Sequence, residues 1–229
     1  MELIGNFKLL FRFEYPVKCE SSTRALECDH QSIRDVLESS FPTTAEANLV
    51  NELRESGALW VSLVAETEQG DVIGHVAFSP VSLDFRDAPG DSADRIAAAT
   101  AVAAVGGGVG LGPVAVRPEW QRRGVGSALV RQGLERCRTL EQRPAFCVVL
   151  GDPHFYARFG FRPARTFGLT SDYDDHHTTT STSINSQAKS AEQINLDSAD
   201  APFMVLEFLP GALSGVRAHV LYHKSFNSL

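Results

Sequence analysis

One segment in the middle of the chain constrains the fold more than any other. The apolar run Val114–Val116 leads through Arg117–Trp120 into Gln-Arg-Arg-Gly-Val-Gly at 121–126, and an amphipathic stretch follows. This order predicts a strand, a glycine turn and a helix. Glycines at 124 and 126 permit positive φ and leave no side chain to hold an anion away. Because the first turn of a helix presents unpaired N–H groups, the segment predicts a pyrophosphate site.

A second segment, residues 149–161, places a short helix directly after another apolar strand. Asp152 is positioned to cap this helix, Pro153 to start it, and Gly160 to supply a left-handed residue after it. Tyr156 is therefore expected on a single helical turn next to the strand end.

Together the two segments resemble the GNAT superfamily of N-acetyltransferases. Gln121, Gly124 and Gly126 match its acetyl-CoA-binding signature Gln/Arg-x-x-Gly-x-Gly/Ala, and residues 149–161 resemble its strand, short helix and Tyr-x-x-Phe-Gly-Phe block. The resemblance covers roughly residues 25–222. It implies an α/β (α+β) GNAT fold, with a mixed central sheet of about seven strands that is flanked by helices and splayed at the central strand.

The resemblance implies acetyl-CoA as cosubstrate and assigns its binding to the first segment. Backbone groups of the strand would pair with the pantetheine arm, and the turn would take the pyrophosphate. The two arginines of the turn would add positive potential. The expected cofactor-binding residues are Val114, Ala115, Val116, Gln121, Arg122, Arg123, Gly124, Val125, Gly126 and Ser127.

The resemblance also places Tyr156 where many members have a tyrosine that protonates or hydrogen-bonds the leaving thiolate. A phenol suits this role because it is neutral at pH 7 and donates through its O–H; the alternative is a core aromatic residue. The general base stays open between Glu66, His75, Asp152, His154 and an ordered water. The family implies direct attack by the amine, without a covalent enzyme intermediate.

The expected activity is transfer of an acetyl group from acetyl-CoA to a primary amine on a small molecule or peptide. The alternative is a non-catalytic acyl-CoA-binding or sensing module, which is considered because the central strand carries no acidic residue to act as base. The net charge of −7 argues against nucleic acid as a partner.

The cysteines and the hydropathy of the chain give expectations about metal binding, membrane insertion and localisation. Four cysteines without Cys-x-x-Cys spacing predict no metal site. We expect no signal peptide and no membrane span, and therefore a cytoplasmic location. The expected oligomeric state is a monomer or a homodimer.

The expected organisation is a single domain over residues 25–229, with residues 1–24 outside the resemblance as an added strand, a disordered arm or a start-site artefact. Strands are predicted at 60–66 and 72–85. A partly mobile insertion is expected near 86–108, and a polar, exposed insertion near 171–201.

Helix ends and the last strands give further expectations. Asp29 is predicted to cap a first helix, and Thr43 with Glu46 forms a capping-box pattern before a second one. Residues 203–209 and 216–223 are predicted to close the sheet as an antiparallel hairpin.

Overall fold

The computed structural model describes residues 2–4, 7–13, 23–86, 91–104, 106–173 and 201–229. The chain divides into two compact units. Unit 1 comprises Met1–Pro80, Leu111–Glu141 and His223–Leu229, and unit 2 comprises Val81–Gly110 and Gln142–Tyr222. Strands β4 (Val72–Asp84) and β5 (Gly108–Val116) contribute residues to both. No helix in the described ranges is long and apolar enough to span a membrane.

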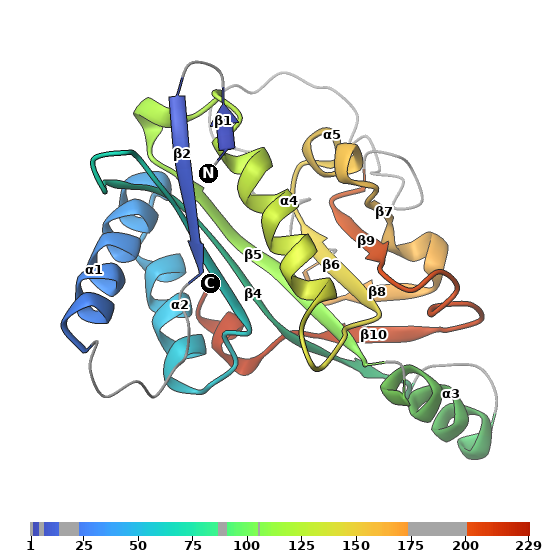
Figure 1. The fold of residues 1–229 in the computed structure, drawn as a ribbon. Coiled ribbons are helices and arrows are strands. Elements are labelled where there is room, and N and C mark those ends of the chain that lie inside the picture. Colours follow the sequence, from blue (N-terminus) through green and yellow to red (C-terminus); the bar gives the residue numbers. More distant parts are fainter. Residues whose placement is uncertain (1, 5–6, 14–22, 87–90, 105, 174–200) are drawn as a thin grey trace, which may run out of the picture. The chain divides into compact units, whose positions relative to one another are not determined.

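The sheet of unit 1 begins with strands from the N-terminal segment (Figure 1). β1 (Glu2–Ile4), β2 (Phe7–Phe13) and β3 (Val61–Glu66) pair in sequence order, and β3 pairs with β4, in each case antiparallel. Residues 2–4 and 7–13 therefore form added strands at the edge of this sheet, which was one of the three alternatives for residues 1–24.

The helices of unit 1 start earlier or later than their capping patterns predict. They are α1 (Thr23–Ser40), α2 (Ala45–Glu55) and α4 (Val125–Arg138), with the short 3₁₀ turns η1 (Pro118–Trp120) and η5 (Lys224–Ser228). α1 begins upstream of Asp29, so the predicted cap there is wrong. Thr43 Oγ1 accepts the N–H of Ala45 at 3.3 Å, but the N-cap is Thr44, whose side chain makes no capping hydrogen bond, so the predicted capping box is not formed.

Strand β4 lies between helices that cover both of its faces within unit 1. On one face its glycine leaves room for α4, since a Cβ on Gly74 would lie 2.9 Å from Leu129 Cδ1. On the other face Ala77 packs in a cluster with residues of α1 and α2. The mostly apolar sequence of β4 suits a strand that is buried on both faces. The close approach at Gly74 packs the first turns of α4 against this strand.

Unit 2 contains a mixed sheet. Its strands are β6 (Phe146–Leu150), β7 (Arg162–Pro163), β8 (Leu169–Ser171), β9 (Phe203–Glu207) and β10 (Ala218–Leu221). β9 pairs antiparallel with β6 and β7, whereas β10 pairs antiparallel with β4 and parallel with β8. The predicted hairpin of the last two strands is therefore wrong. Left-handed turns at Gly211 and Gly215 redirect the chain between them.

The segment predicted as a partly mobile insertion contains a helix, α3 (Ser92–Ala104). The Asp91 carboxylate accepts the N–H groups of Ala93 and Asp94 at 2.8 and 3.0 Å and so caps it. Alanine is the strongest helix former, which outweighs the glycines around the run. Val102 is 5% exposed within the core cluster of unit 2. Most of the second insertion, residues 174–200, lies outside the described residues.

Candidate functional site

The end of β5 is fixed by side chains from three parts of unit 1. The carbonyl of Val116 accepts hydrogen bonds from Gln121 Nε2 at 2.9 Å and from Ser40 Oγ at 3.1 Å. Arg117 donates its N–H to Ile73 O and its Nε–H to Val72 O, both at 2.9 Å. Gln121 therefore folds back onto the strand and sets the path of the following turn.

Part of the turn has the left-handed backbone that the glycine pattern predicts. Gly124 has φ 91° and is the N-cap of α4, and Arg122 has φ 57°. Gly126 lies inside α4 with helical backbone, so the prediction of positive φ is confirmed for Gly124 and wrong for Gly126.

The start of α4 has backbone donors that no intrahelical acceptor satisfies. Ala128 donates to Gly124 O at 3.0 Å, so the N–H groups of Val125, Gly126 and Ser127 precede the first intrahelical bond. The turn from Gln121 to Gly124 is exposed. Arg123 stacks over the Trp120 ring at 5.1 Å. This arrangement can receive an anion through N–H groups, helix dipole and guanidinium charge together.

The second motif forms the predicted cap within unit 2. The Asp152 carboxylate accepts the N–H of His154 at 2.9 Å, and Pro153 is the first residue of α5 (Pro153–Tyr156). The 3₁₀ turn η2 (Ala157–Phe159) follows and ends at Gly160, which has φ 92°. Asp152 thus orients α5 and has a clear structural role.

Tyr156 lies in an aromatic cluster with little access to solvent. Its side chain is 9% exposed and makes edge-to-face contacts with Phe155 at 4.9 Å and Phe161 at 5.8 Å. A Cβ on Gly151 would lie 2.5 Å from Tyr156 Cε2, so that glycine makes room for the ring. Burial raises the pKa of Tyr156, with further upward contributions from Cys147 and Asp152. The phenol is therefore uncharged at neutral pH and retains its O–H as a hydrogen-bond donor.

The candidate bases of unit 1 are both engaged in contacts that stabilise the sheet. Glu66 forms an ion pair with Arg12 of the neighbouring strand β2. His75 is completely buried, with Nε2 2.8 Å from Ser62 Oγ. The position of His75 is therefore that of a packed residue inside the sheet.

The described cysteines lie inside the protein. Cys137 and Cys147 are buried, and burial raises the pKa of the Cys137 thiol to about 12. Among the residues with described positions, no group of three or more His, Cys, Asp or Glu side chains is placed to hold a metal ion.

Comparison with known proteins places the chain in a family. A family model described as acetyltransferase (GNAT) domain matches residues 57–163, which include both motifs. The uncharacterized N-acetyltransferase YhbS of Escherichia coli K12 is 32% identical over 219 residues, which cover 96% of this chain and 99% of YhbS. The chain belongs to the GNAT family of N-acetyltransferases. The similarity to this GNAT protein extends beyond the residues 25–222 that the motifs led us to expect.

Solved GNAT structures confirm the predicted fold. The crystal structure of Escherichia coli YhbS in complex with CoA has a TM-score of 0.67 at 30% identity, covering 99% of this chain and 96% of that one. A GNAT acetyltransferase from Brucella melitensis in complex with acetyl-CoA has a TM-score of 0.58 at 28% identity, covering 96% and 99%.

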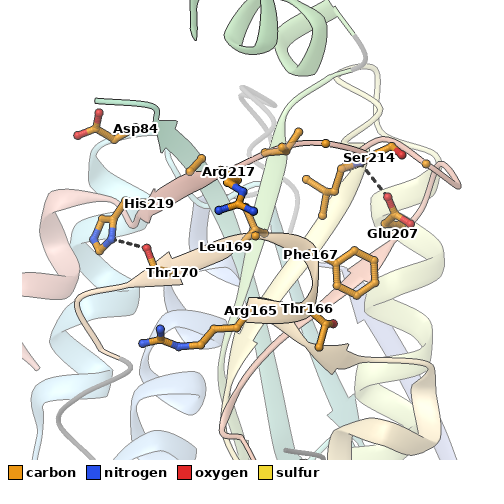
Figure 2. A pocket seen from close by; sticks show the side chains of 16 residues that line it. Asp84, Arg165, Thr166, Phe167, Leu169, Thr170, Glu207, Ser214, Arg217 and His219 are labelled. Atoms are coloured by element: carbon orange, nitrogen blue, oxygen red, sulfur yellow. Dashed lines mark hydrogen bonds between the residues drawn. The ribbon is translucent and has the colours of Figure 1, made fainter. Parts of the chain in front are cut away.

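Sequence reasoning missed a hollow of about 800 Å³ in unit 2 (Figure 2). It lies among η3 (Ala164–Phe167), β8, β10 and the turns before β10. The parallel register of β8 and β10 places His219 opposite Thr170. His219 Nδ1 lies 3.0 Å from Thr170 Oγ1, and Nε2 lies 3.0 Å from Asp172 Oδ1. No local signal could reveal this, because the pairing joins distant parts of the sequence.

Proposed function

We propose that this N-acetyltransferase binds acetyl-CoA at the turn of residues 121–127 and transfers the acetyl group to a primary amine. The observation that carries the proposal is the left-handed turn at Gly124, which opens α4 with three N–H groups ahead of the first intrahelical bond. The structures of YhbS with CoA and of the Brucella melitensis protein with acetyl-CoA support it.

Each part of the segment has a distinct proposed role. The N–H groups of Val125, Gly126 and Ser127 face the pyrophosphate, and Arg122 and Arg123 add charge-assisted contacts. Gln121 acts as a positioning residue through its bond to Val116 O. The backbone of Val114, Ala115 and Val116 pairs with the pantetheine amides.

The proposed reaction is a direct displacement. The neutral amine attacks the thioester carbonyl, the new C–N bond forms as the C–S bond breaks, and Tyr156 donates its proton or a hydrogen bond to the departing thiolate. Its raised pKa keeps the O–H protonated and so favours a hydrogen bond to the thiolate over complete proton transfer. The positions of Glu66 and His75 do not favour either as base, so we assign the proton of the amine to water.

A turnover assay separates the enzyme from the alternative sensing module. CoA release is followed by a thiol reagent with acetyl-CoA and panels of polyamines, amino acids, aminoglycosides and peptides with free N-termini. Release that requires one amine and yields its acetylated product supports the enzyme. Tight acetyl-CoA binding without turnover on any amine would favour the sensor, and absence of acetyl-CoA binding would reject the site.

A further inference from the structure

Two arginines from separate parts of the chain line the hollow of unit 2. Arg165 comes from η3, and Arg217 directly precedes β10. In Figure 2 the Arg217 guanidinium lies near the middle of the view, with His219 to one side and Phe167 to the other. Guanidinium groups are the side chains that best match carboxylates and phosphates.

The other charged groups of the hollow are already engaged. Asp84 forms an ion pair with Arg86, which lowers the pKa of Asp84. Glu207 Oε1 accepts the N–H of Leu213 at 2.8 Å and thereby holds the turn before β10. Thr170 and Asp172 engage both ring nitrogens of His219. By contrast, Arg217 is exposed and makes no hydrogen bond or ion pair with any residue whose position is described.

The charges around the hollow favour a singly charged ligand. Arg217 is an exposed cation of the lining, whereas the Glu207 carboxylate belongs to the same lining and Asp172 adjoins it through His219. A carboxylate that pairs with Arg217 brings one negative charge near Glu207 and Asp172, and a phosphate dianion brings two.

One wall of the hollow is aromatic. Phe167 is half-buried, and Arg162 covers its ring at 4.9 Å. The aliphatic residues Leu169 and Leu213 also line the hollow and are 0% and 2% exposed. Phe167 offers an apolar contact for a planar group in the same hollow whose lining includes Arg217.

We propose that this hollow binds a small aromatic carboxylate, with Arg217 as the partner of the carboxylate and Phe167 as the contact of the ring. The proposal concerns unit 2 alone and does not depend on acetyl transfer. It adds to the acetyl-CoA turn a second ligand site of different chemistry.

The test is calorimetry on the full chain without acetyl-CoA, using 3-phenylpropionate as probe. We expect binding, with a loss of about 10- to 100-fold for 3-phenylpropan-1-ol and for the Arg217→Gln variant, since each removes one charge-assisted contact. Phe167→Leu should weaken the probe, and Arg217→Lys should retain part of the affinity. Inorganic phosphate should bind more weakly than the probe.

The matched control is Arg131→Gln, which removes an exposed arginine of α4 in unit 1 and should leave the affinity unchanged. Melting temperatures of the variants verify folding. Absence of probe binding up to about 10 mM, a value of Kd beyond which affinity is negligible, would overturn the proposal. Equal binding of the alcohol, stronger binding of phosphate, or an unchanged Kd in a folded Arg217→Gln protein would overturn it as well.

Discussion

The hydroxyl of Tyr156 is a single group whose removal separates chemistry from packing. Tyr156→Phe keeps the ring among Phe155 and Phe161, so we expect the fold and the acetyl-CoA affinity to persist while kcat falls about 10- to 10⁴-fold. The measurement is steady-state CoA release with the best amine of the panel. Tyr173→Phe, the same change elsewhere in unit 2, is the control; an unaltered kcat in Tyr156→Phe would remove this residue from the mechanism.

The buried phenol also predicts how stability depends on pH. The pKa of Tyr156 is raised in the folded chain, so the folded state retains its proton where the unfolded chain, with a tyrosine pKa of about 10, loses it. Stability from this group is therefore intact below about pH 10 and declines above it, by up to about 1.4 kcal/mol per pH unit. Urea unfolding between about pH 8 and 11 should show a steeper decline in wild type than in Tyr156→Phe. Parallel curves would contradict the raised pKa.

At the scale of elements, the turn before α4 depends on the absence of a side chain. Gly126 lies in the first helical turn, so Gly126→Val should leave α4 intact but block approach of the pyrophosphate, with a loss of at least about tenfold in acetyl-CoA affinity. Glu135→Val places the same side chain on an exposed position of α4 and should bind normally. Calorimetry decides: wild-type affinity in a folded Gly126→Val protein would refute the site.

The packing of α4 on the sheet makes a second element-level prediction. A Cβ on Gly133 would lie 2.3 Å from Phe78 Cε2. Alanine is favoured over glycine in a helix by about 1 kcal/mol, but overpacking costs about 1–3 kcal/mol, so Gly133→Ala should reduce the free energy of unfolding. In a Phe78→Leu background the same substitution should lose this penalty. Equal effects in both backgrounds, measured by urea unfolding, would show that the ring does not limit α4.

Elements governed by nearby residues were predictable, and those governed by distant pairing were not. The strand, turn and helix around Gly124 and the Asp152 cap follow from neighbouring residues, and the structure confirms both. α3 does not follow from the composition of its segment, because the flanking glycines indicate a flexible chain while the helix propensity of the alanine run outweighs them. The partners of β10, and with them the contact of His219 with Thr170, depend on long-range pairing that no local pattern encodes.

At the scale of the whole molecule, acetyl-CoA should stabilise the folded chain. Binding to the native state alone adds about 2.7 kcal/mol at a ligand concentration of 100 times Kd. We expect a rise in Tm with acetyl-CoA that Gly126→Val largely abolishes. Trp120 lies under Arg123 beside the turn, so its fluorescence should report the same titration. A Tm that acetyl-CoA leaves unchanged in wild type would contradict the proposed site.

Glycines and aromatic rings occur in matched pairs in both units. A Cβ on Gly108 would meet Phe146, one on Gly133 would meet Phe78, and one on Gly151 would meet Tyr156, each within 2.5 Å. A side chain at one of these glycines collides with the paired ring, so it destabilises the fold unless that ring is smaller or displaced. Homologous sequences should therefore show coordinated replacement at these positions, and a lineage that gains a side chain at residue 151 should have given up the tyrosine at 156, and with it the proposed proton donor.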